Sequence, residues 1–189
     1  MKKYELTAEF IEQWGKKLFR IKALISFGSV EAGELGGYVE KEDNLAQDGD
    51  AWVYGNAWVY GNARVCDDAW VYGDAEVYGD AWVYGNAEVY GNARVCGDAK
   101  VCGDADYLLI GRIGSRFSFT TFFKNKDKGI TVSCGCFLGT IAEFRAKVSD
   151  THGNNKHAKI YNLAADMAEL QILGEEHFEN LNTNKSEPF

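Results

Sequence analysis

The chain has 189 residues and a formal net charge of −8, with 28 acidic against 20 basic side chains. No stretch is apolar and long enough to cross a membrane, and the charged first residues lack the apolar core of a signal peptide. The five cysteines, an odd number, fit reduced thiols rather than a disulfide framework. We therefore expect a cytoplasmic protein with one elongated domain or two small ones, and no membrane partner.

Residues 1–46 are expected to form an N-terminal β cap and a degenerate first coil. Apolar side chains alternate along Leu18–Phe27, which predicts a strand. Val39 and Leu45 are six residues apart, the spacing of the repeat that follows, whereas Leu45 and Val53 are eight apart. This longer step predicts a two-residue bulge before the regular coils begin.

Residues 47–106 carry a six-residue repeat of the form A-[WREK]-V-[YC]-G-[ND], whose alanines recur without a break from Ala51 to Ala99. Within each unit Ala and Val alternate with larger residues, so they face one side of a strand. Gly followed by Asn or Asp supplies a corner, because these residues tolerate positive φ. Three such sides close a coil of about 18 residues, and successive coils stack at about 4.8 Å. The repeat predicts a left-handed parallel β-helix, the hexapeptide-repeat solenoid.

Residues one coil apart are expected to stack in columns on the outer surface. The first strand positions give the columns Trp52–Trp70–Glu88, Trp58–Glu76–Arg94 and Arg64–Trp82–Lys100. The third positions give the columns Tyr54–Tyr72–Tyr90, Tyr60–Tyr78–Cys96 and Cys66–Tyr84–Cys102. Aromatic and cationic side chains in such columns can pair across neighbouring strands.

The aromatic columns and acidic corners are the candidate protein-binding surface. Contiguous exposed aromatics mark binding sites, and Tyr and Trp are frequent anchors of protein interfaces. Residues 51–106 contain nine acidic and three basic side chains, so we expect a basic partner and no direct nucleic-acid contact through the β-helix. The candidate residues are Trp52, Tyr54, Trp58, Trp70, Tyr72, Trp82, Tyr90, Asp68 and Asp104. The alternative is that the ladders only stiffen the rod and the acids only keep it soluble.

Residues 107–173 are expected to form a small α+β module, a β-hairpin plus two helices, that caps the β-helix. The predicted strands are Tyr107–Ile110, Ser115–Phe123 and Ile130–Cys136. Thr140 and Glu143 form a capping box that begins a first helix. A second helix is expected over about Asn155–Leu173. Its predicted apolar stripe is Ile160, Leu163, Ala164, Met167 and Leu170. The polar residues 174–189 are expected to be disordered.

Two clusters in this module are candidate binding sites. The basic residues Arg112, Arg116, Lys124, Lys126 and Lys128 alternate with phenylalanines. They could clamp single-stranded nucleic acid, or they could lie on a hairpin with one face in the core. Cys134 and Cys136, followed by His152 and His157, have the composition of a zinc site, but structural zinc sites usually separate paired cysteines by two or more residues. Core packing explains the thiols equally, and we expect no metal and no cofactor.

The runs Phe19–Leu24, Gly33–Val39 and Asn44–Ala46, followed by the repeats, resemble a hexapeptide-repeat family of bacteria, phages and prophages. Members of that family are labelled polymer-forming cytoskeletal proteins or putative transferases. The segments Val132–Phe137, Gly139–Thr140, Glu143–Phe144 and Thr151–Gly153 look like a module appended to such proteins in phages of Gram-positive hosts.

The resemblance implies a phage-type accessory protein in the cytoplasm of a bacterial host. We expect it to be a non-enzymatic protein that binds a host protein or nucleoprotein. In the most concrete version it inhibits a nucleic-acid-handling defence complex, as anti-CRISPR proteins do. The alternative is a self-assembling scaffold that forms homo-oligomers or filaments.

An acyltransferase is a further alternative, because many hexapeptide β-helices transfer acyl groups. Those enzymes, and the carbonic anhydrases of the same fold, depend on histidines in the coils or in loops extruded from them. Here all three histidines, His152, His157 and His177, follow the repeats. An acyltransferase would therefore have to borrow a histidine from a neighbouring subunit. The corner carboxylates Asp50, Asp68 and Asp104, with Asp67 beside them, could also hold a cation, although calcium needs six to eight oxygen ligands.

Overall fold

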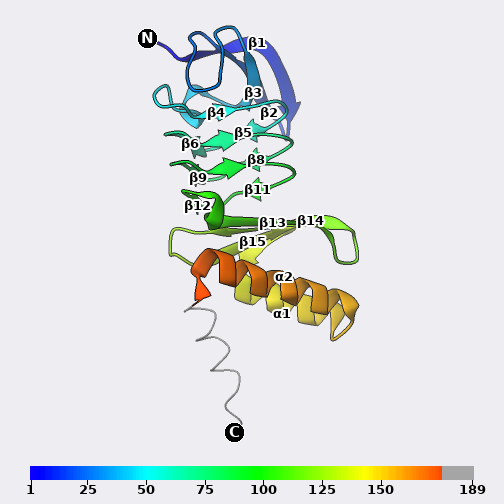
Figure 1. The fold of residues 1–189 in the computed structure, drawn as a ribbon. Coiled ribbons are helices and arrows are strands. Elements are labelled where there is room, and N and C mark those ends of the chain that lie inside the picture. Colours follow the sequence, from blue (N-terminus) through cyan, green and yellow to red (C-terminus); the bar gives the residue numbers. More distant parts are fainter. Residues whose placement is uncertain (176–189) are drawn as a thin grey trace. The chain divides into compact units, whose positions relative to one another are not determined.

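The computed structural model describes residues 1–175, except for the side chain of Asp104 (Figure 1). The chain divides into two compact units, Met1–Asp104 and Ala105–Phe189, which we describe one at a time. The predicted fold class is confirmed: the protein is mainly β, with a parallel β-solenoid and a C-terminal sheet that carries two helices. Most of the predicted disordered segment, from residue 176 onward, lies outside the described residues.

The first unit begins with an antiparallel hairpin of β1 (Tyr4–Gln13) and β2 (Lys16–Ala23). Its two-residue turn is Trp14–Gly15, with φ angles of 49° and 74°. Two successive positive φ values are typical of hairpin turns that match the twist of the strands. Strand β3 (Leu35–Val39) pairs antiparallel with β2. The predicted strand Leu18–Phe27 corresponds to β2, which ends at Ala23, whereas β1 and β3 were not predicted.

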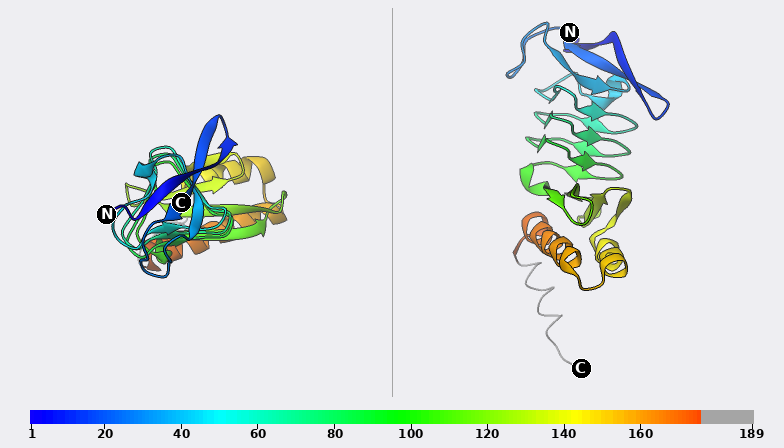
Figure 2. Two further views of the ribbon diagram at one scale, coloured as in Figure 1. Left: turned by 90° about the horizontal axis from the view of Figure 1, so that it is seen from above. Right: turned by 90° about the vertical axis from the view of Figure 1, so that its right-hand side faces the viewer.

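Nine two-residue strands then build the coils, and their first residues are those named in the predicted columns. They are β4 (Trp52–Val53), β5 (Trp58–Val59), β6 (Arg64–Val65), β7 (Trp70–Val71), β8 (Glu76–Val77), β9 (Trp82–Val83), β10 (Glu88–Val89), β11 (Arg94–Val95) and β12 (Lys100–Val101). They form three parallel stacks, β4–β7–β10, β5–β8–β11 and β6–β9–β12, and β3 extends the second of these (Figure 2).

The three predicted columns of first strand positions are confirmed by the strand register. Trp70 pairs with Trp52 and Glu88, Glu76 with Trp58 and Arg94, and Trp82 with Arg64 and Lys100. Inside the coils, every repeat alanine from Ala51 to Ala99 and every repeat valine from Val53 to Val101 is fully buried. The narrow interior of the coils therefore consists of two small residue types. The outward side chains can vary between repeats without changing this interior.

The backbone geometry of the corners explains why glycine occupies most of them and how one repeat can carry aspartate instead. Most corner glycines have positive φ, and a Cβ on Gly79 would stand 2.9 Å from the backbone nitrogen of Gly97 in the next coil. Asp67 takes the glycine position in its unit with a φ of 59°. Its carboxylate accepts a hydrogen bond from the backbone N–H of Gly85 at 3.0 Å, which offsets part of the conformational cost.

The predicted degenerate coil and bulge are also present. Val39 pairs with Val59 and Leu45 bridges to Val65, whereas Val53 pairs with Val71. Two extra residues therefore enter between Leu45 and Val53, after the short 3-10 helix η1 (Glu42–Asn44).

Buried polar side chains satisfy the backbone at this irregular end. Asn44 is fully buried, and its amide donates to the carbonyls of Gly61 at 3.1 Å and Ala63 at 2.8 Å. The Lys3 ammonium donates to three carbonyl oxygens, those of Asp48, Gly49 and Ala51, at 2.9 to 3.2 Å. Loss of hydration on burial lowers the pKa of Lys3 from 10.5 to about 8.

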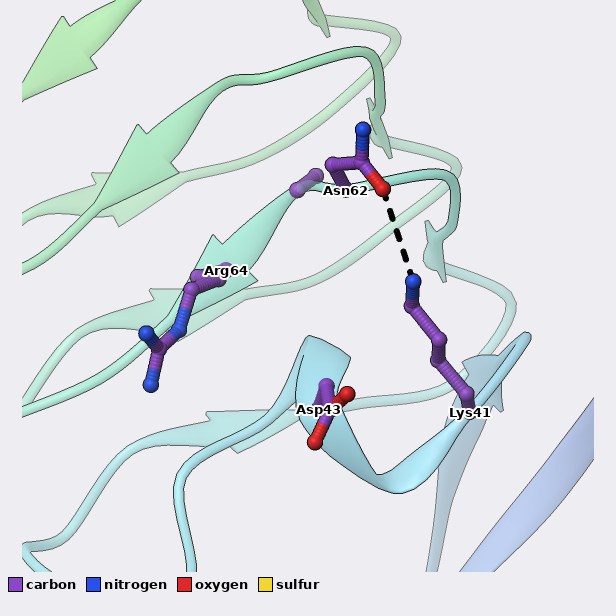
Figure 3. A pocket seen from close by; sticks show the side chains of 5 residues that line it. Lys41, Asp43, Asn62 and Arg64 are labelled. Carbon is purple, nitrogen blue, oxygen red and sulfur yellow. Dashed lines mark hydrogen bonds between the residues drawn. The ribbon is translucent and has the colours of Figure 1, made fainter.

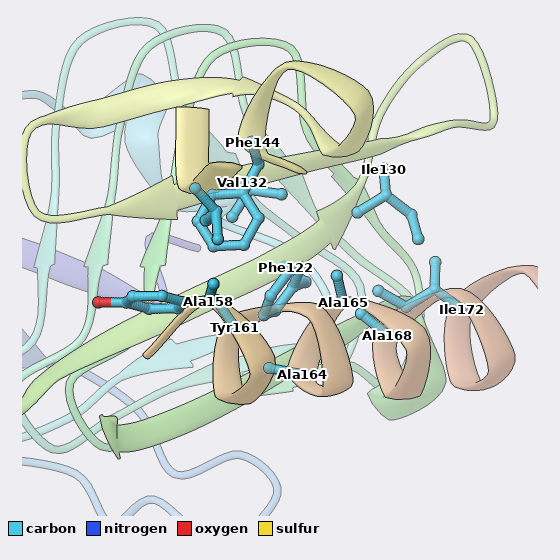
Figure 4. Packing of buried hydrophobic residues seen from close by; sticks show 11 residues of the cluster. Phe122, Ile130, Val132, Phe144, Ala158, Tyr161, Ala164, Ala165, Ala168 and Ile172 are labelled. Atoms are coloured by element: carbon cyan, nitrogen blue, oxygen red, sulfur yellow. The ribbon is translucent and has the colours of Figure 1, made fainter. Parts of the chain in front are cut away.

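In the second unit a short 3-10 helix, η2 (Asp104–Asp106), leads into a four-stranded antiparallel meander. Its strands are β13 (Tyr107–Ile113), β14 (Ser118–Lys124), β15 (Ile130–Cys134) and β16 (Phe137–Thr140). Helices α1 (Ile141–His152) and α2 (Lys156–Leu173) follow. The predicted capping box of Thr140 and Glu143 is confirmed. Phe122, Val132 and Phe144 pack with the alanines of α2 in the core of the unit (Figure 4).

The predicted apolar stripe of α2 is wrong in its main members. Leu163, Met167 and Leu170 are 63%, 57% and 45% exposed. The buried face consists instead of Ala158, Tyr161, Ala164, Ala165, Ala168, Glu169 and Ile172. Helix α2 has two apolar stripes, and the face rich in alanine packs on the core because small side chains let the helix axis approach closely.

We predict that Lys3→Met destabilises the protein by about 1 to 3 kcal/mol at neutral pH, because three carbonyls lose their donor. The matched control is Lys2→Met, because Lys2 is exposed and forms one surface ion pair with Glu42. Chemical denaturation measures both variants, and equal effects would contradict the structural role of Lys3.

The same pair of variants has a distinct dependence on pH. Because the folded pKa of Lys3 lies below the unfolded value of 10.5, the unfolded chain holds the proton over a range in which the folded chain has lost it. The contribution of Lys3 to the free energy of unfolding therefore rises as the pH increases from about 8 to 10.5. Lys3→Met removes this increment and Lys2→Met keeps it.

Candidate docking surface

The three stacks of the solenoid present three chemically different outer faces. We call them by their central tryptophans: the Trp70 face on β4, β7 and β10, the Trp58 face on β5, β8 and β11, and the Trp82 face on β6, β9 and β12. The predicted docking residues are divided among these faces, so they do not form one continuous surface.

The Trp70 face carries four of the predicted aromatics as two pairs of rings in contact. The rings of Tyr54 and Trp70 meet edge to face at 5.6 Å, and those of Tyr72 and Tyr90 stack at 5.4 Å with an interplanar angle of 18°. The Tyr72 hydroxyl donates to Glu88 at 2.8 Å. Tyr90 is 46% exposed, while Tyr54, Trp70 and Tyr72 are partly exposed. These two pairs form a partly exposed column of rings, which we call the aromatic ladder.

The charges on the Trp70 face are of one sign. Its three sides, residues 50–56, 68–74 and 86–92, contain no lysine or arginine. They carry the carboxylates Asp50, Asp68, Asp74 and Glu88. The Asp68 carboxylate accepts a hydrogen bond from the backbone N–H of Asp50 at 3.3 Å. A face with only negative side chains attracts cationic groups and repels nucleic acid.

Trp52, also predicted to be a docking residue, is fully buried. The rings of Tyr4 and Phe27 pack against it at 6.1 and 5.4 Å, both edge to face. Its indole Nε1 has no hydrogen-bond partner within residues 1–175. The prediction was wrong because the N-terminal segment covers the first coil and turns an outward position into a core position.

The Trp58 face is covered in part by Trp14 from the hairpin turn. The Trp14 ring lies 5.8 Å from Trp58 and 5.5 Å from Tyr60, and Tyr60 stacks on Tyr78 at 5.0 Å. Desolvation raises the pKa of both tyrosines well above 10. Trp14 was not predicted to have a role. A tryptophan directly before a glycine, between two segments of alternating residues, could have indicated an aromatic side chain at a hairpin turn.

The Trp82 face is basic around its tryptophan. The Lys100 ammonium lies 3.7 Å from the Trp82 ring centroid, and the Arg64 guanidinium lies 5.6 Å from it on the neighbouring strand. These are cation–π contacts. Trp82 is 40% exposed, but its surroundings differ in sign from those of Trp70. The side chain of Asp104, also predicted to be a docking residue, lies outside the described part of the chain.

A small polar hollow of about 340 Å³ lies beside this region, between Lys41, Asp43, Asn62 and Arg64 (Figure 3). The Lys41 ammonium donates to the Asn62 side chain at 3.5 Å across it. None of the predicted docking residues lines the hollow.

The five basic residues predicted to contact nucleic acid are also divided. Arg116 lies in the β13–β14 turn, whereas Lys126 and Lys128 lie in the β14–β15 turn, at the other end of a seven-residue strand. That strand is roughly 20 Å long. Lys124 forms an ion pair with Asp106 at 2.8 Å, and Arg112 is exposed on β13. The two turns therefore form separate basic sites.

The candidate zinc ligands do not form a recognisable metal centre. The His152 and His157 rings lie 5.8 Å apart, and the Thr120 hydroxyl donates to the Cys134 sulfur at 3.2 Å. Within the described part of the chain, no group of three or more His, Cys, Asp and Glu side chains could hold a metal ion.

A family model described as the YdcK β-solenoid repeat matches residues 57–73, which span β5 to β7. This match agrees with the observed coils, and it covers about one coil of the chain. A search of curated proteins finds no match. In the described residues, no helix has the length and apolar character required to cross a membrane.

We predict that Trp52→Ala and Trp82→Ala differ strongly although they change the same repeat position. Trp52→Ala leaves a cavity under Tyr4 and Phe27 and should lower the free energy of unfolding by about 3 to 5 kcal/mol. Trp82→Ala should cost about 1 kcal/mol or less, because its ring is partly solvated and makes only exposed cation–π contacts. Chemical denaturation measures both, and similar losses would contradict the assignment of Trp52 to the core.

Proposed function

We propose that the protein is a non-enzymatic binding protein whose Trp70 face docks on a basic surface of a partner protein. The observation that carries this proposal is the aromatic ladder of Tyr54, Trp70, Tyr72 and Tyr90 on a face whose own residues include four carboxylates and no lysine or arginine. The buried ammonium of Lys3 lies beside Asp50 and Asp68 at the first coil and leaves Asp74 and Glu88 as the carboxylates away from it.

The ladder is suited to binding because it is already ordered. Stacking between Tyr72 and Tyr90, and the hydrogen bond from Tyr72 to Glu88, fix side chains that would otherwise lose rotamer freedom on association. Tyrosine and tryptophan are frequent hot-spot residues at protein interfaces. The surrounding carboxylates would accelerate encounter with a cationic partner and disfavour acidic ones.

A partner that handles nucleic acid fits this chemistry best. Such proteins carry basic surfaces that contact phosphates, and an acidic face can compete for them. The sequence resemblance to phage-type proteins supports the narrower version, in which the protein occupies the nucleic-acid surface of a bacterial defence complex. An acyltransferase is disfavoured because residues 51–106 contain no histidine to act as a general base.

Self-assembly is the second candidate, and the exposed stripe of Leu163, Met167 and Leu170 on α2 favours it. The three residues are four and three positions apart, the spacing of a helix-pairing seam. Sedimentation at several concentrations tests this candidate, with Leu163→Glu as the variant. A monomer at every concentration would contradict self-assembly and leave the docking proposal intact.

The docking proposal is tested by affinity capture from nuclease-treated bacterial lysate. We expect a captured protein whose binding weakens at least tenfold in a Trp70→Ala and Tyr72→Ala double variant, since interface aromatics commonly contribute more than about 1.4 kcal/mol each. Trp82→Ala is the matched control, at the same repeat position on a different face, and should bind as the unchanged protein does.

A charge variant tests the expected basic partner. Asp74→Lys places a cation on the Trp70 face and should weaken the same complex, most strongly at low salt. Binding that survives both the aromatic and the charge variants would rule out the Trp70 face as the docking surface. Circular dichroism and denaturation confirm that each variant is folded.

A further inference from the structure

The C-terminal unit contains a cleft of about 390 Å³ that the sequence did not reveal. Its walls come from four places in the chain: the β13–β14 turn, the β15–β16 turn, helix α1 and helix α2. The volume lies within the range of about 300 to 1,000 Å³ that is typical of small-molecule sites.

The charged side chains that line the cleft are all basic. Arg116 comes from the β13–β14 turn and Lys147 comes from α1, while no aspartate or glutamate lines the cleft. Across residues 1–175, neither Arg116 nor Lys147 forms an ion pair. In a chain with a net charge of −8, a concave site with only basic charges is a local reversal of sign. Such a site concentrates anions.

Hydroxyl groups stand beside these cations. Ser115 and Ser118 line the cleft on either side of Arg116 in the sequence. Serine hydroxyls and an arginine guanidinium are common donors to phosphate oxygens, and the guanidinium can bind two oxygens at once. The polar side of the cleft therefore has the composition of a phosphate site.

Aromatic side chains also line the cleft. Phe137, Phe144 and Tyr161 line it, and the Phe144 ring meets Tyr161 edge to face at 5.6 Å and Phe137 at 5.6 Å. The His152 ring stacks on Tyr161 with centroids 5.8 Å apart. Figure 4 shows Tyr161 at one end of the core cluster, with its hydroxyl directed away from the helix alanines. Phe144 and Tyr161 are buried, whereas Phe137 and His152 are partly exposed, so a flat group can bury its face against the latter two rings.

The β13–β14 turn is fixed against Tyr161. Gly114 has a φ of 72°, and a Cβ there would stand 1.8 Å from the Tyr161 hydroxyl. The turn therefore approaches Tyr161 as closely as only glycine allows, which holds the Arg116 backbone next to the cleft. Desolvation raises the pKa of Tyr161 to about 12, so its hydroxyl remains a hydrogen-bond donor at neutral pH.

Phe117 follows Arg116 and is the most exposed aromatic residue in the described chain, at 71%. It holds a left-handed conformation with a φ of 48°. That conformation costs an aromatic residue about 1 to 2 kcal/mol, and nothing in the fold recovers this cost through burial of the ring. Arg116 and Ser118, on either side of Phe117 in the sequence, line the cleft, whereas Phe117 itself does not.

We propose that this cleft binds a phosphate-bearing nucleotide. Arg116 and Lys147 contact the phosphate, and the partly exposed rings of Phe137 and His152 contact the base. The phosphate can belong to a free nucleotide or to the end of a nucleic-acid strand, and the chemistry of recognition is the same. The site is independent of the Trp70 face, because it lies in the other unit and uses none of the docking residues.

Calorimetric titration of the full chain tests the proposal with nucleoside 5′-monophosphates, inorganic phosphate and the unphosphorylated nucleosides. We expect monophosphates to bind at least tenfold more tightly than either inorganic phosphate or nucleosides, because both halves of the cleft are then used. Single-stranded oligonucleotides with and without a 5′ phosphate show whether the bound phosphate belongs to a free nucleotide or to the end of a strand. Preference for the phosphorylated strand over the free nucleotide would assign the site to nucleic-acid ends.

The variants are Arg116→Gln with Lys147→Gln, which keep the size and polarity of the side chains and remove the charge. We expect at least a tenfold loss of nucleotide affinity. Lys128→Gln is the matched control, because Lys128 lies in the β14–β15 turn, at the other end of β14, and its change should leave binding unaltered.

Three results would overturn the proposal: no binding of any monophosphate at millimolar concentration, equal binding in the double variant, or equal affinity for inorganic phosphate and monophosphates. Equal affinity for inorganic phosphate and monophosphates would show that the aromatic side chains do not contribute to binding. Failure of nucleotide binding would leave capture through the Trp70 face unaffected, so the two proposals fail separately.

Discussion

The closure of each coil around a column of valines and alanines is the constraint on which the solenoid depends. The interior admits only these small side chains, and all of them are fully buried. Each coil is held to the next by backbone hydrogen bonds such as Tyr54 N–H to Val71 C=O at 2.8 Å. This ladder fixes the strand spacing, so outward residues one coil apart must stand in contact. The aromatic stacks on the outer faces are therefore a consequence of coil length combined with the choice of outward residue.

The terminal coil of such a stack differs from the inner ones, because no following coil pairs with its backbone groups or covers its apolar surface. At the N-terminal end the chain meets both needs. Lys3 and Asn44 donate to carbonyls at the irregular coil, and Tyr4 and Phe27 cover Trp52. The same residue type, tryptophan at the first strand position, is thus buried at Trp52 in the first regular coil and exposed at Trp82, five strands later. Its role is set by position along the stack.

The coils could be predicted from the sequence because one short period determines which residues pair. The register of Trp58 with Glu76, for example, follows from counting alone. Trp52 could not be predicted, since its burial depends on β1, whose alternation is interrupted by a register shift between Leu6 and Phe10. Helix α2 was misjudged for another reason: it has two apolar stripes, and periodicity cannot decide which one packs. The cleft was invisible because its walls come from four separate segments.

The two proposed sites also explain why the net charge of the whole chain does not indicate which charged groups each unit binds. Residues 51–106 carry nine acidic and three basic side chains, whereas residues 107–189 carry nine acidic and ten basic ones. An acidic face would attract cationic protein surfaces, and the proposed cleft, with its arginine and lysine, would attract phosphate. A partner that combines a basic protein surface with bound nucleotide or nucleic acid presents both features. Each unit would then recognise a different chemical component of that partner, and the opposite charges of the two sites would keep either component from binding at the wrong one.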